Sequence, residues 1–190
     1  ALRKAFGKNI PIRIDPNAAW KYETALACAT KLKGVIEYLE DPVRGQENMS
    51  RLKKETNIPL ATNMCTTSFE DLPDSIRLNS EDIILCDHHF WGGLKSSLEL
   101  ANLCTVIGRS VSMHSNSHLG ISMAAMIHLG AALPAFDYDL DTHYPWQVEE
   151  IVGSGRIPFD DGAIRVPQTP GLGVELDRAA LARLHTAYQS

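Results

Sequence analysis

The sequence predicts an α/β fold, specifically a portion of a (β/α) barrel. Six short apolar runs alternate with segments of helical periodicity, and each run ends at a polar residue capable of chemistry. The first five of these residues are 25, 23, 24 and 27 positions apart, which is about one strand, one helix and two short loops. The C-terminal strand ends of a barrel share one mouth, so we expect these residues to converge on one site. They are Asp15, Glu40, Asn63, Asp87, His114, and Asp141 or His143.

The apolar runs are the predicted strands. They are rich in Ile, Val and Leu with little alternation, as is typical of strands that are buried on both faces. A whole barrel has about 250 residues and this chain has 190, so we expect roughly strands three to eight. The predicted strands are residues 10–14, 35–39, 59–62, 82–86, 110–113 and 136–140.

The segments between the strands are predicted helices. Residues 22–33 place alanines and leucines on one face, and Gly34 follows where a C-terminal cap is expected. Ser68 precedes an acidic first turn, as an N-cap does. The remaining predicted helices are residues 46–56, 68–78, 94–107, 119–133 and 177–188.

The alternation ends at about residue 145, which suggests two parts. Residues 1–145 form the barrel portion. Residues 146–190 begin with a turn-rich stretch and end in the last predicted helix. We expect this second part to be a returning tail that packs on the barrel or on a capping domain.

Composition narrows the class of protein and of partner. The net charge of −5 gives no electrostatic reason to expect nucleic acid or an anionic membrane. No apolar run approaches the roughly 20 residues of a membrane span, and no signal peptide opens the chain, so a cytoplasmic protein is expected. The cysteines lack CxxC spacing and are read as buried free thiols, not disulfides. They are Cys28, Cys65, Cys86 and Cys104.

Asp15, Glu40 and Asn63 are candidate metal ligands on three consecutive strand ends. Each alone could be a helix N-cap or a loop residue that faces water. Together they offer the hard oxygen donors that Mg²⁺ prefers. Two carboxylates and one amide leave Mg²⁺ formally neutral, so the site can still accept an anionic substrate.

Asp87 and His114 end the next two predicted strands and form a candidate catalytic pair. Neighbouring strands lie about 4.8 Å apart, so the carboxylate can fix the tautomer of the imidazole and raise its basicity. His114 would then serve as a general base or acid. The alternative is a histidine that is hydrogen-bonded for structure alone.

Further polar residues near these strand ends can contact a polyhydroxylated or carboxylated ligand. The candidates are Asn17, Asn63, Ser115, Asn116 and His143.

Other histidines carry weaker signals. His114 and His118 have the four-residue spacing of a helical zinc pair, but a strand precedes them, so shared helical ligation is not expected. His88 and His89 could bind a metal, yet the segment HHFWGG is more simply read as a loop that packs aromatic rings over the barrel end.

Several ordered motifs resemble the glucarate dehydratase branch of the enolase superfamily. They are IDPNAAW, YLEDP, ATNM, DHHFWGG, HSNSHLGIS, DTHYPW and PGLGVELD. The resemblance covers nearly the whole chain and implies that Mg²⁺ is held by Asp15, Glu40 and Asn63, with His114 and Asp87 as the base dyad. It also implies that the substrate-binding candidates named above contact a small sugar diacid, and we expect a homo-oligomer.

The reaction implied by the resemblance is removal of water from D-glucarate to give 5-dehydro-4-deoxy-D-glucarate. His114 would take the proton beside one carboxylate, and the neighbouring hydroxyl would leave. Enolase-superfamily sites combine a Lys or His base with Mg²⁺. The metal supplies stabilisation of the charge that grows in the transition state.

One family feature is missing from these residues. Glucarate dehydratases carry a Lys-x-Lys strand before the first metal ligand and an N-terminal capping domain, whereas only Lys4 and Lys8 precede Asp15 here. We therefore expect further residues upstream, and poor folding of this piece alone. The open alternatives are a dehydratase or epimerase for another diacid, a different metal-dependent barrel enzyme, and a non-catalytic relative.

Overall fold

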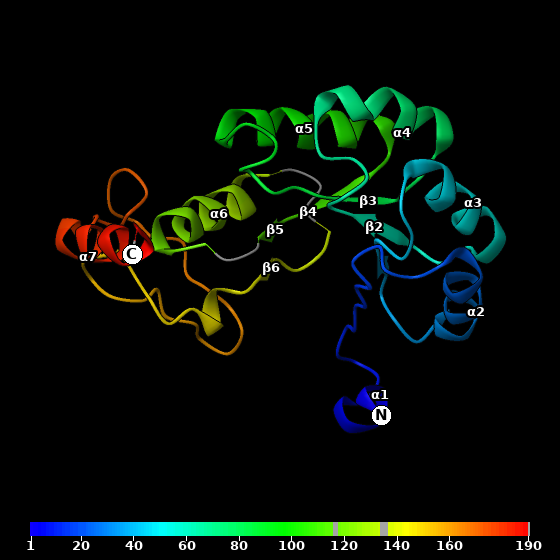
Figure 1. The fold of residues 1–190 in the computed structure, drawn as a ribbon, viewed down its shortest axis with the longest axis horizontal. Coiled ribbons are helices and arrows are strands. Elements are labelled where there is room, and N and C mark those ends of the chain that lie inside the picture. The colour runs from blue at the N-terminus through cyan, green and yellow to red at the C-terminus, as the bar shows by residue number, and fades with distance from the viewer. Residues whose placement is uncertain (116–117, 134–136, 190) are drawn as a thin grey trace.

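The strands form a parallel arc, as expected for part of a barrel (Figure 1). This computed structural model describes residues 1–115, 118–133 and 137–189. Four strands pair in the order of the sequence, and parallel pairing of this kind requires a crossover after each strand. The strands are β1 (Leu39–Glu40), β2 (Leu60–Thr62), β3 (Ile83–Leu85) and β4 (Ser110–Ser112).

A short junction extends the arc beyond β4. β5 (His114–Ser115) pairs in parallel with β6 (Asp141–Thr142). β4 and β5 are separated only by Met113, whose carbonyl oxygen accepts a hydrogen bond from the Asp141 N–H at 2.9 Å. The chain from 110 to 115 is thus one extended segment that pairs first with β3 and then with β6.

Helices supply the crossovers between the strands. Figure 1 shows α2 to α6 along the outer side of the arc. Gly108 ends α5 in the left-handed conformation at φ 71°, which glycine adopts without strain. In the part of the chain that the structure describes, no helix is long and apolar enough to cross a membrane. The helices are α1 (Leu2–Phe6), α2 (Tyr22–Leu32), α3 (Gln46–Thr56), α4 (Leu72–Leu78), α5 (Leu94–Ile107), α6 (Gly120–Ala132) and α7 (Arg178–Gln189), with single 3₁₀ turns η1 (Phe69–Asp71) and η2 (Tyr144–Trp146).

The core lies between the strands and these helices. Leu39 and Leu60 are register partners on β1 and β2, and both are fully buried beneath α2 and α3. Ile84 and Val111 are register partners on β3 and β4, and they pack in a second cluster with residues of α5 and α6. Burial on both faces explains why the strand sequences are continuously apolar.

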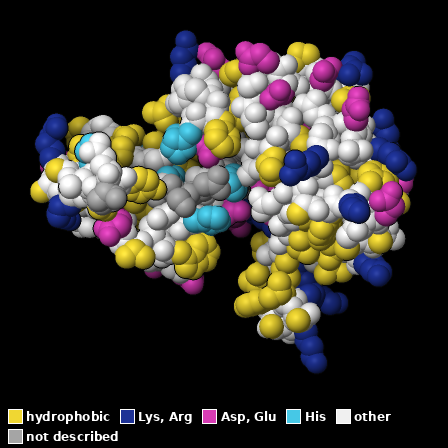
Figure 2. Space-filling view, viewed as in Figure 1, with side chains coloured by type: hydrophobic (Ala, Val, Ile, Leu, Met, Phe, Trp, Pro, Cys, Tyr) yellow, Lys and Arg dark blue, Asp and Glu magenta, His cyan; other side chains and the backbone are white. Residues whose placement is uncertain are grey.

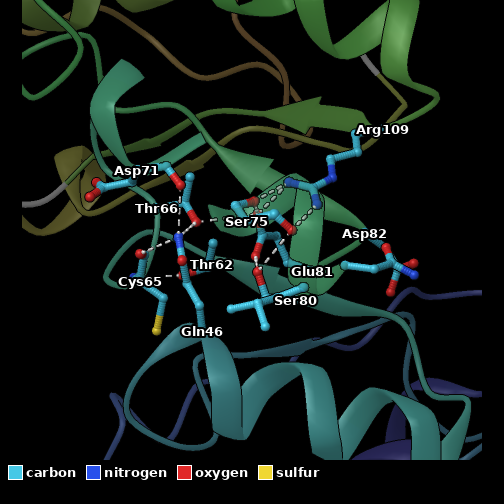
Figure 3. A network of polar contacts seen from close by, with 12 residues as sticks. Gln46, Thr62, Cys65, Thr66, Asp71, Ser75, Ser80, Glu81, Asp82 and Arg109 are labelled. Carbon is cyan, nitrogen blue, oxygen red and sulfur yellow. Dashed lines mark hydrogen bonds and ion pairs between the residues drawn. The ribbon is translucent and has the colours of Figure 1, made fainter. Parts of the chain in front are cut away.

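A buried polar network fills the space under α4, at the N-terminal ends of β3 and β4 (Figure 3). Arg109 Nη1 lies 2.6 Å from Glu81 Oε1, and both side chains are almost wholly excluded from water. Arg109 also donates to the Ser75 carbonyl oxygen at 2.7 Å, and the Ser75 and Ser80 hydroxyls donate to Glu81. The positive charge of Arg109 thus compensates the negative charge of Glu81, which would be costly to bury alone.

Two predicted strands differ from the structure. Of residues 10–14, Ile14 forms an isolated parallel bridge to Leu39, and the Ile12 carbonyl oxygen accepts the Glu37 N–H at 2.8 Å, but the segment forms no continuous strand. Pro11 lacks an N–H donor, which weakens pairing at this edge. The predicted strand 136–140 is displaced, because pairing starts at β6, and residue 136 lies outside the described residues.

The C-terminal tail, residues 146–190, doubles back on itself and adds no further parallel strand to the arc among the described residues. Val152 and Leu176 form an isolated antiparallel bridge, which brings the end of the tail back to its beginning. α7 follows it, and Figure 1 shows this helix beyond α6, away from β1 and β2.

All four cysteines are free, as predicted. Cys86 and Cys104 are buried, and burial raises the pKa of Cys86 to about 12 and that of Cys104 to about 11. Cys28 and Cys65 are half-buried.

Candidate active site

Asp15 and Glu40 lie side by side at the first two strand ends. Glu40 N–H donates to the Ile14 carbonyl oxygen at 2.9 Å, which places the residue after Ile14 next to β1. Burial raises the pKa of Glu40 to about 9, and the nearby charges of Asp15 and Asp41 raise it further in the same direction. Partial burial also raises the pKa of Asp15, which is more open to solvent than Glu40. Carboxyls that resist ionisation when alone are suited to a cation that compensates their charge.

The Glu40 side chain gives a direct observation in favour of a cation. Its Oε1 is buried and has no hydrogen-bond partner among the described residues. A buried acceptor without a partner is costly, since it has lost water and gained nothing in exchange. Asp15 and Glu40 therefore fit the oxygen donor set that Mg²⁺ requires.

Asn63 follows β2, next to β1, and its loop is held by a residue that the motif analysis did not single out. The buried Asp41 carboxylate accepts the Asn63 N–H at 2.8 Å and the Thr62 hydroxyl at 2.5 Å. Burial raises the pKa of Asp41 to about 6. Ligation of a metal by Asn63 stays a prediction. The one sequence feature that pointed to Asp41 was its position directly after Glu40.

His114 lies in β5, opposite Asp141 in β6. The imidazole is buried, and its Nδ1 has no hydrogen-bond partner in the described part of the chain. Burial lowers the pKa of His114, while the charges of Asp141, Asp87 and Asp15 act in the opposite direction. A neutral imidazole surrounded by carboxylates can accept a proton and have the resulting charge stabilised.

The sequence predicts that Asp87 pairs directly with His114 and fixes its tautomer, and the structure corrects this expectation. Asp87 Oδ1 accepts the His89 backbone N–H at 2.8 Å and contacts His89 Nδ1 at 2.6 Å. Among the described residues, no hydrogen bond joins Asp87 to His114. The reason is local, because a carboxylate two residues before an N–H in a turn closes a short ring with it. Asp87 therefore acts on His114 only through its charge, and the catalytic roles of both stay predictions.

The substrate-binding candidates lie in different environments. Asn17 is exposed, and its N–H donates to Asp15 Oδ1 at 2.7 Å. His143 is exposed, with its ring 5.9 Å from that of Trp146. The Ser115 hydroxyl is buried and contacts His118 at 2.8 Å, so it is already engaged within the protein. Asn116 lies outside the described residues.

This arrangement can hold a divalent cation and move a proton beside it. Asp141 links the two functions, because its charge raises the pKa of Asp15 and of Glu40 and favours protonation of His114. Acids and base thus lie within electrostatic range of one another, although they come from opposite ends of the arc.

The chain is similar in sequence to curated relatives and in fold to solved structures. A probable glucarate dehydratase from Streptomyces coelicolor is 48% identical over 185 residues, which is 97% of this chain and 42% of that protein. An enolase from Pseudomonas fluorescens with bound magnesium, potassium and tartrate gives a TM-score of 0.95 at 49% identity, over 100% of this chain and 44% of that one. An enolase from Gibberella zeae complexed with magnesium, formate and sulfate gives 0.94 at 52% identity, over 99% and 44%.

The chain spans less than half the length of these proteins. The model of the enolase C-terminal domain-like family matches residues 1–180. With parallel strands in sequential order and acids at their C-terminal ends, the chain belongs to the enolase C-terminal domain-like family.

Proposed function

We propose that this chain carries the acid cluster and the base of a magnesium-dependent hydro-lyase that acts on an acid sugar, with D-glucarate as substrate. The observation that carries the proposal is the buried, unpartnered Oε1 of Glu40 beside Asp15, together with the buried, unpartnered Nδ1 of His114. The product is 5-dehydro-4-deoxy-D-glucarate.

Asp15, Glu40 and Asn63 are the residues that would hold the metal. When bound, Mg²⁺ supplies Lewis-acid stabilisation of negative charge on a substrate carboxylate. Asp41 holds the backbone that carries Asn63, because its carboxylate accepts the Asn63 N–H and the neighbouring Thr62 hydroxyl.

His114 takes the proton from the carbon beside the carboxylate. Such a proton is far less acidic than imidazolium, and each pKa unit of mismatch costs about 1.4 kcal/mol. The charges of Asp141, Asp87 and Asp15 stabilise the imidazolium that forms. The hydroxyl on the neighbouring carbon then leaves with the electron pair of its C–O bond, and water is released after protonation.

Two comparisons support the choice of substrate class. The Streptomyces coelicolor relative is a probable glucarate dehydratase. The Pseudomonas fluorescens structure holds magnesium and tartrate, and tartrate is a hydroxylated diacid like D-glucarate. Cytoplasmic location and homo-oligomerisation are part of the same proposal.

The test is His114→Asn in the full-length protein, with D-glucarate and Mg²⁺. Loss of a general base lowers turnover by about 10² to 10⁴, and the Kd for Mg²⁺, measured by calorimetry, should stay within a few fold. His185→Asn, on the exposed face of α7, is the matched control and should keep the wild-type rate.

Near wild-type turnover by His114→Asn would remove His114 from the reaction. Product analysis by NMR separates the alternatives. A keto-deoxy diacid identifies a dehydratase, an inverted carbon identifies an epimerase, and no turnover of any hexarate identifies a non-catalytic relative.

A further inference from the structure

We propose that His88, His89 and His118 form a second metal site, selective for Zn²⁺ and similar transition metals and separate from the carboxylate site. We call these three residues the histidine cluster. His88 and His89 follow β3, and His118 lies just before α6. The proposal does not depend on the dehydratase function.

The three imidazoles converge on one hydroxyl oxygen. Ser122 Oγ lies 2.7 Å from His89 Nε2, 3.0 Å from His88 Nε2 and 3.2 Å from His118 Nδ1. Three ring nitrogens around one point are the donor set of a tris-histidine zinc site. Ligand atoms of Asp87, His88 and His89 lie within 4.8 Å of one another, whereas His118 is joined to this group through Ser122 Oγ.

The Ser122 hydroxyl cannot provide a hydrogen-bond donor to every ring nitrogen that faces it, whereas a cation can bind all three. Asp87 accepts the proton on His89 Nδ1 when ionised, so neutral His89 presents a lone pair at Nε2. Ser122 has a single proton to donate, whereas a metal ion can bind the lone pairs of all three rings. His88 Nδ1, in a side chain that is more than nine-tenths buried, has no partner among the described residues.

Partners beyond the cluster are those that metal-bound histidines usually have. The outer nitrogen of His89 contacts the Asp87 carboxylate at 2.6 Å. The outer nitrogen of His118 contacts the Ser115 hydroxyl at 2.8 Å and the Thr142 hydroxyl at 2.9 Å. Such contacts orient the ring and raise the basicity of the ligating nitrogen.

Ligand chemistry separates this site from the acid cluster. Neutral imidazole suits Zn²⁺, Cu²⁺ and Ni²⁺, whereas Mg²⁺ prefers oxygen. Burial lowers the pKa of His88 and lowers that of His118 to about 4, so both rings are neutral at pH 7. Magnesium should therefore not compete for the histidine cluster.

An ion can reach the cluster from solvent. The three histidines line a cavity of about 660 Å³ that also contacts Phe90 and Leu172. His89 is exposed, and Figure 2 shows histidine side chains gathered in the middle of the molecular face, beside acidic ones. Zinc–nitrogen bonds are about 2.0 to 2.1 Å, so the Ser122 hydroxyl must rotate away and the rings must close around the ion.

The experiment is calorimetric titration of Zn²⁺ into the full-length protein with saturating Mg²⁺. We expect one saturable Zn²⁺ per chain, bound at least tenfold more weakly by His89→Ala and by His118→Gln. Ser122→Ala, which removes the displaced hydroxyl, should bind as tightly as wild type or more tightly. His185→Ala on the exposed face of α7 is the matched control and should bind as wild type does.

Absence of saturable binding would overturn the proposal, as would binding unchanged in both histidine variants or abolished by Glu40→Gln. Because a variant can misfold, visible absorption of Co²⁺ in the wild type gives a second measurement. Intense bands of tetrahedral nitrogen-ligated Co²⁺ support the site, and a weak octahedral spectrum contradicts it.

Discussion

The backbone N–H of Ala18 donates a hydrogen bond to the carbonyl oxygen of Asp41 across 2.7 Å. This bond joins the loop that follows Asp15 to the residue that follows Glu40. The Asp41 carboxylate in turn holds Asn63 N–H at 2.8 Å. Asp41 therefore connects all three segments that carry the proposed metal ligands.

Asp41→Asn should weaken both stability and metal binding. An amide nitrogen cannot accept the hydrogen bonds that the carboxylate accepts, and an unsatisfied buried donor costs about 1–3 kcal/mol. We expect a free energy of unfolding lower by about that amount, and a higher Kd for Mg²⁺. The exposed Asp74→Asn is the control, and equal Mg²⁺ affinity in both variants would exclude a positioning role for Asp41.

Arg109→Met should be strongly destabilising. It leaves Glu81 buried without a countercharge, and breaking a buried pair in this way costs about 3–5 kcal/mol. The double variant with Glu81→Gln should recover a large part of the loss, as urea unfolding will show. Arg165→Met, at the exposed pair with Asp160, should change stability by less than about 0.5 kcal/mol. A single variant as stable as the double one would contradict the role of the buried pair.

Gly173→Ala should lower the melting temperature more than Gly171→Ala. Both residues have positive φ, at 74° and 72°, so the conformational cost of alanine is shared. A Cβ at Gly173 would lie 2.1 Å from Pro167 Cβ, while one at Gly171 meets nothing within 4 Å. The difference between the variants, measured calorimetrically, isolates this close approach. Equal melting temperatures would show that the tail relaxes freely around Pro167.

The metal-free protein should lose stability between pH 6.5 and 8.5. Glutamate in an unfolded chain ionises near pH 4.3, whereas folded Glu40 keeps its proton until about pH 9. The folded state therefore binds more protons across this window, and stability falls as pH rises. His88, His114 and His118 have lowered pKa values and oppose this trend near pH 6.5, where each is partly protonated in the unfolded chain, but not toward pH 8.5.

The measurement is the melting temperature in a chelating buffer at the two pH values. Glu40→Gln should remove most of the decrease, because the amide does not titrate. Saturating Mg²⁺ should also reduce it, since the bound cation favours ionised Glu40. A melting temperature that rises from pH 6.5 to pH 8.5 would show that Glu40 ionises freely in the folded protein.

Features that depend on strand and helix periodicity were predictable from the sequence. Asp15 and Glu40 are adjacent because consecutive parallel strands end at the same edge of the sheet. Helix α5 ends at Gly108 because glycine adopts the left-handed backbone conformation that terminates a helix. The number of residues between strand ends was sufficient to predict the first, and a glycine directly after a helical run was sufficient to predict the second.

Features that depend on turn geometry were not predictable. The Asp87 carboxylate turns to His89 instead of His114, which depends on the conformation of one short loop. Asp41 has a positive φ of 33°, and its partners come from another strand. His118 and two histidines some 30 positions earlier all contact Ser122, because α6 packs beside the loop after β3. The spacing of these residues in the sequence does not predict that contact.

The extended segment around Met113 pairs with β3 before this residue and with β6 after it. This switch of neighbouring strand affects how His114 is oriented for proton transfer. Leu85 is aligned with Ser112 on one side, and His114 is aligned with Asp141 on the other. Two independent alignments therefore set which way His114 faces, and a slip of one residue in either would turn it over. Since His114 Nδ1 has no hydrogen-bond partner among the described residues, a proton can be gained or lost at that atom without breaking a hydrogen bond of the fold.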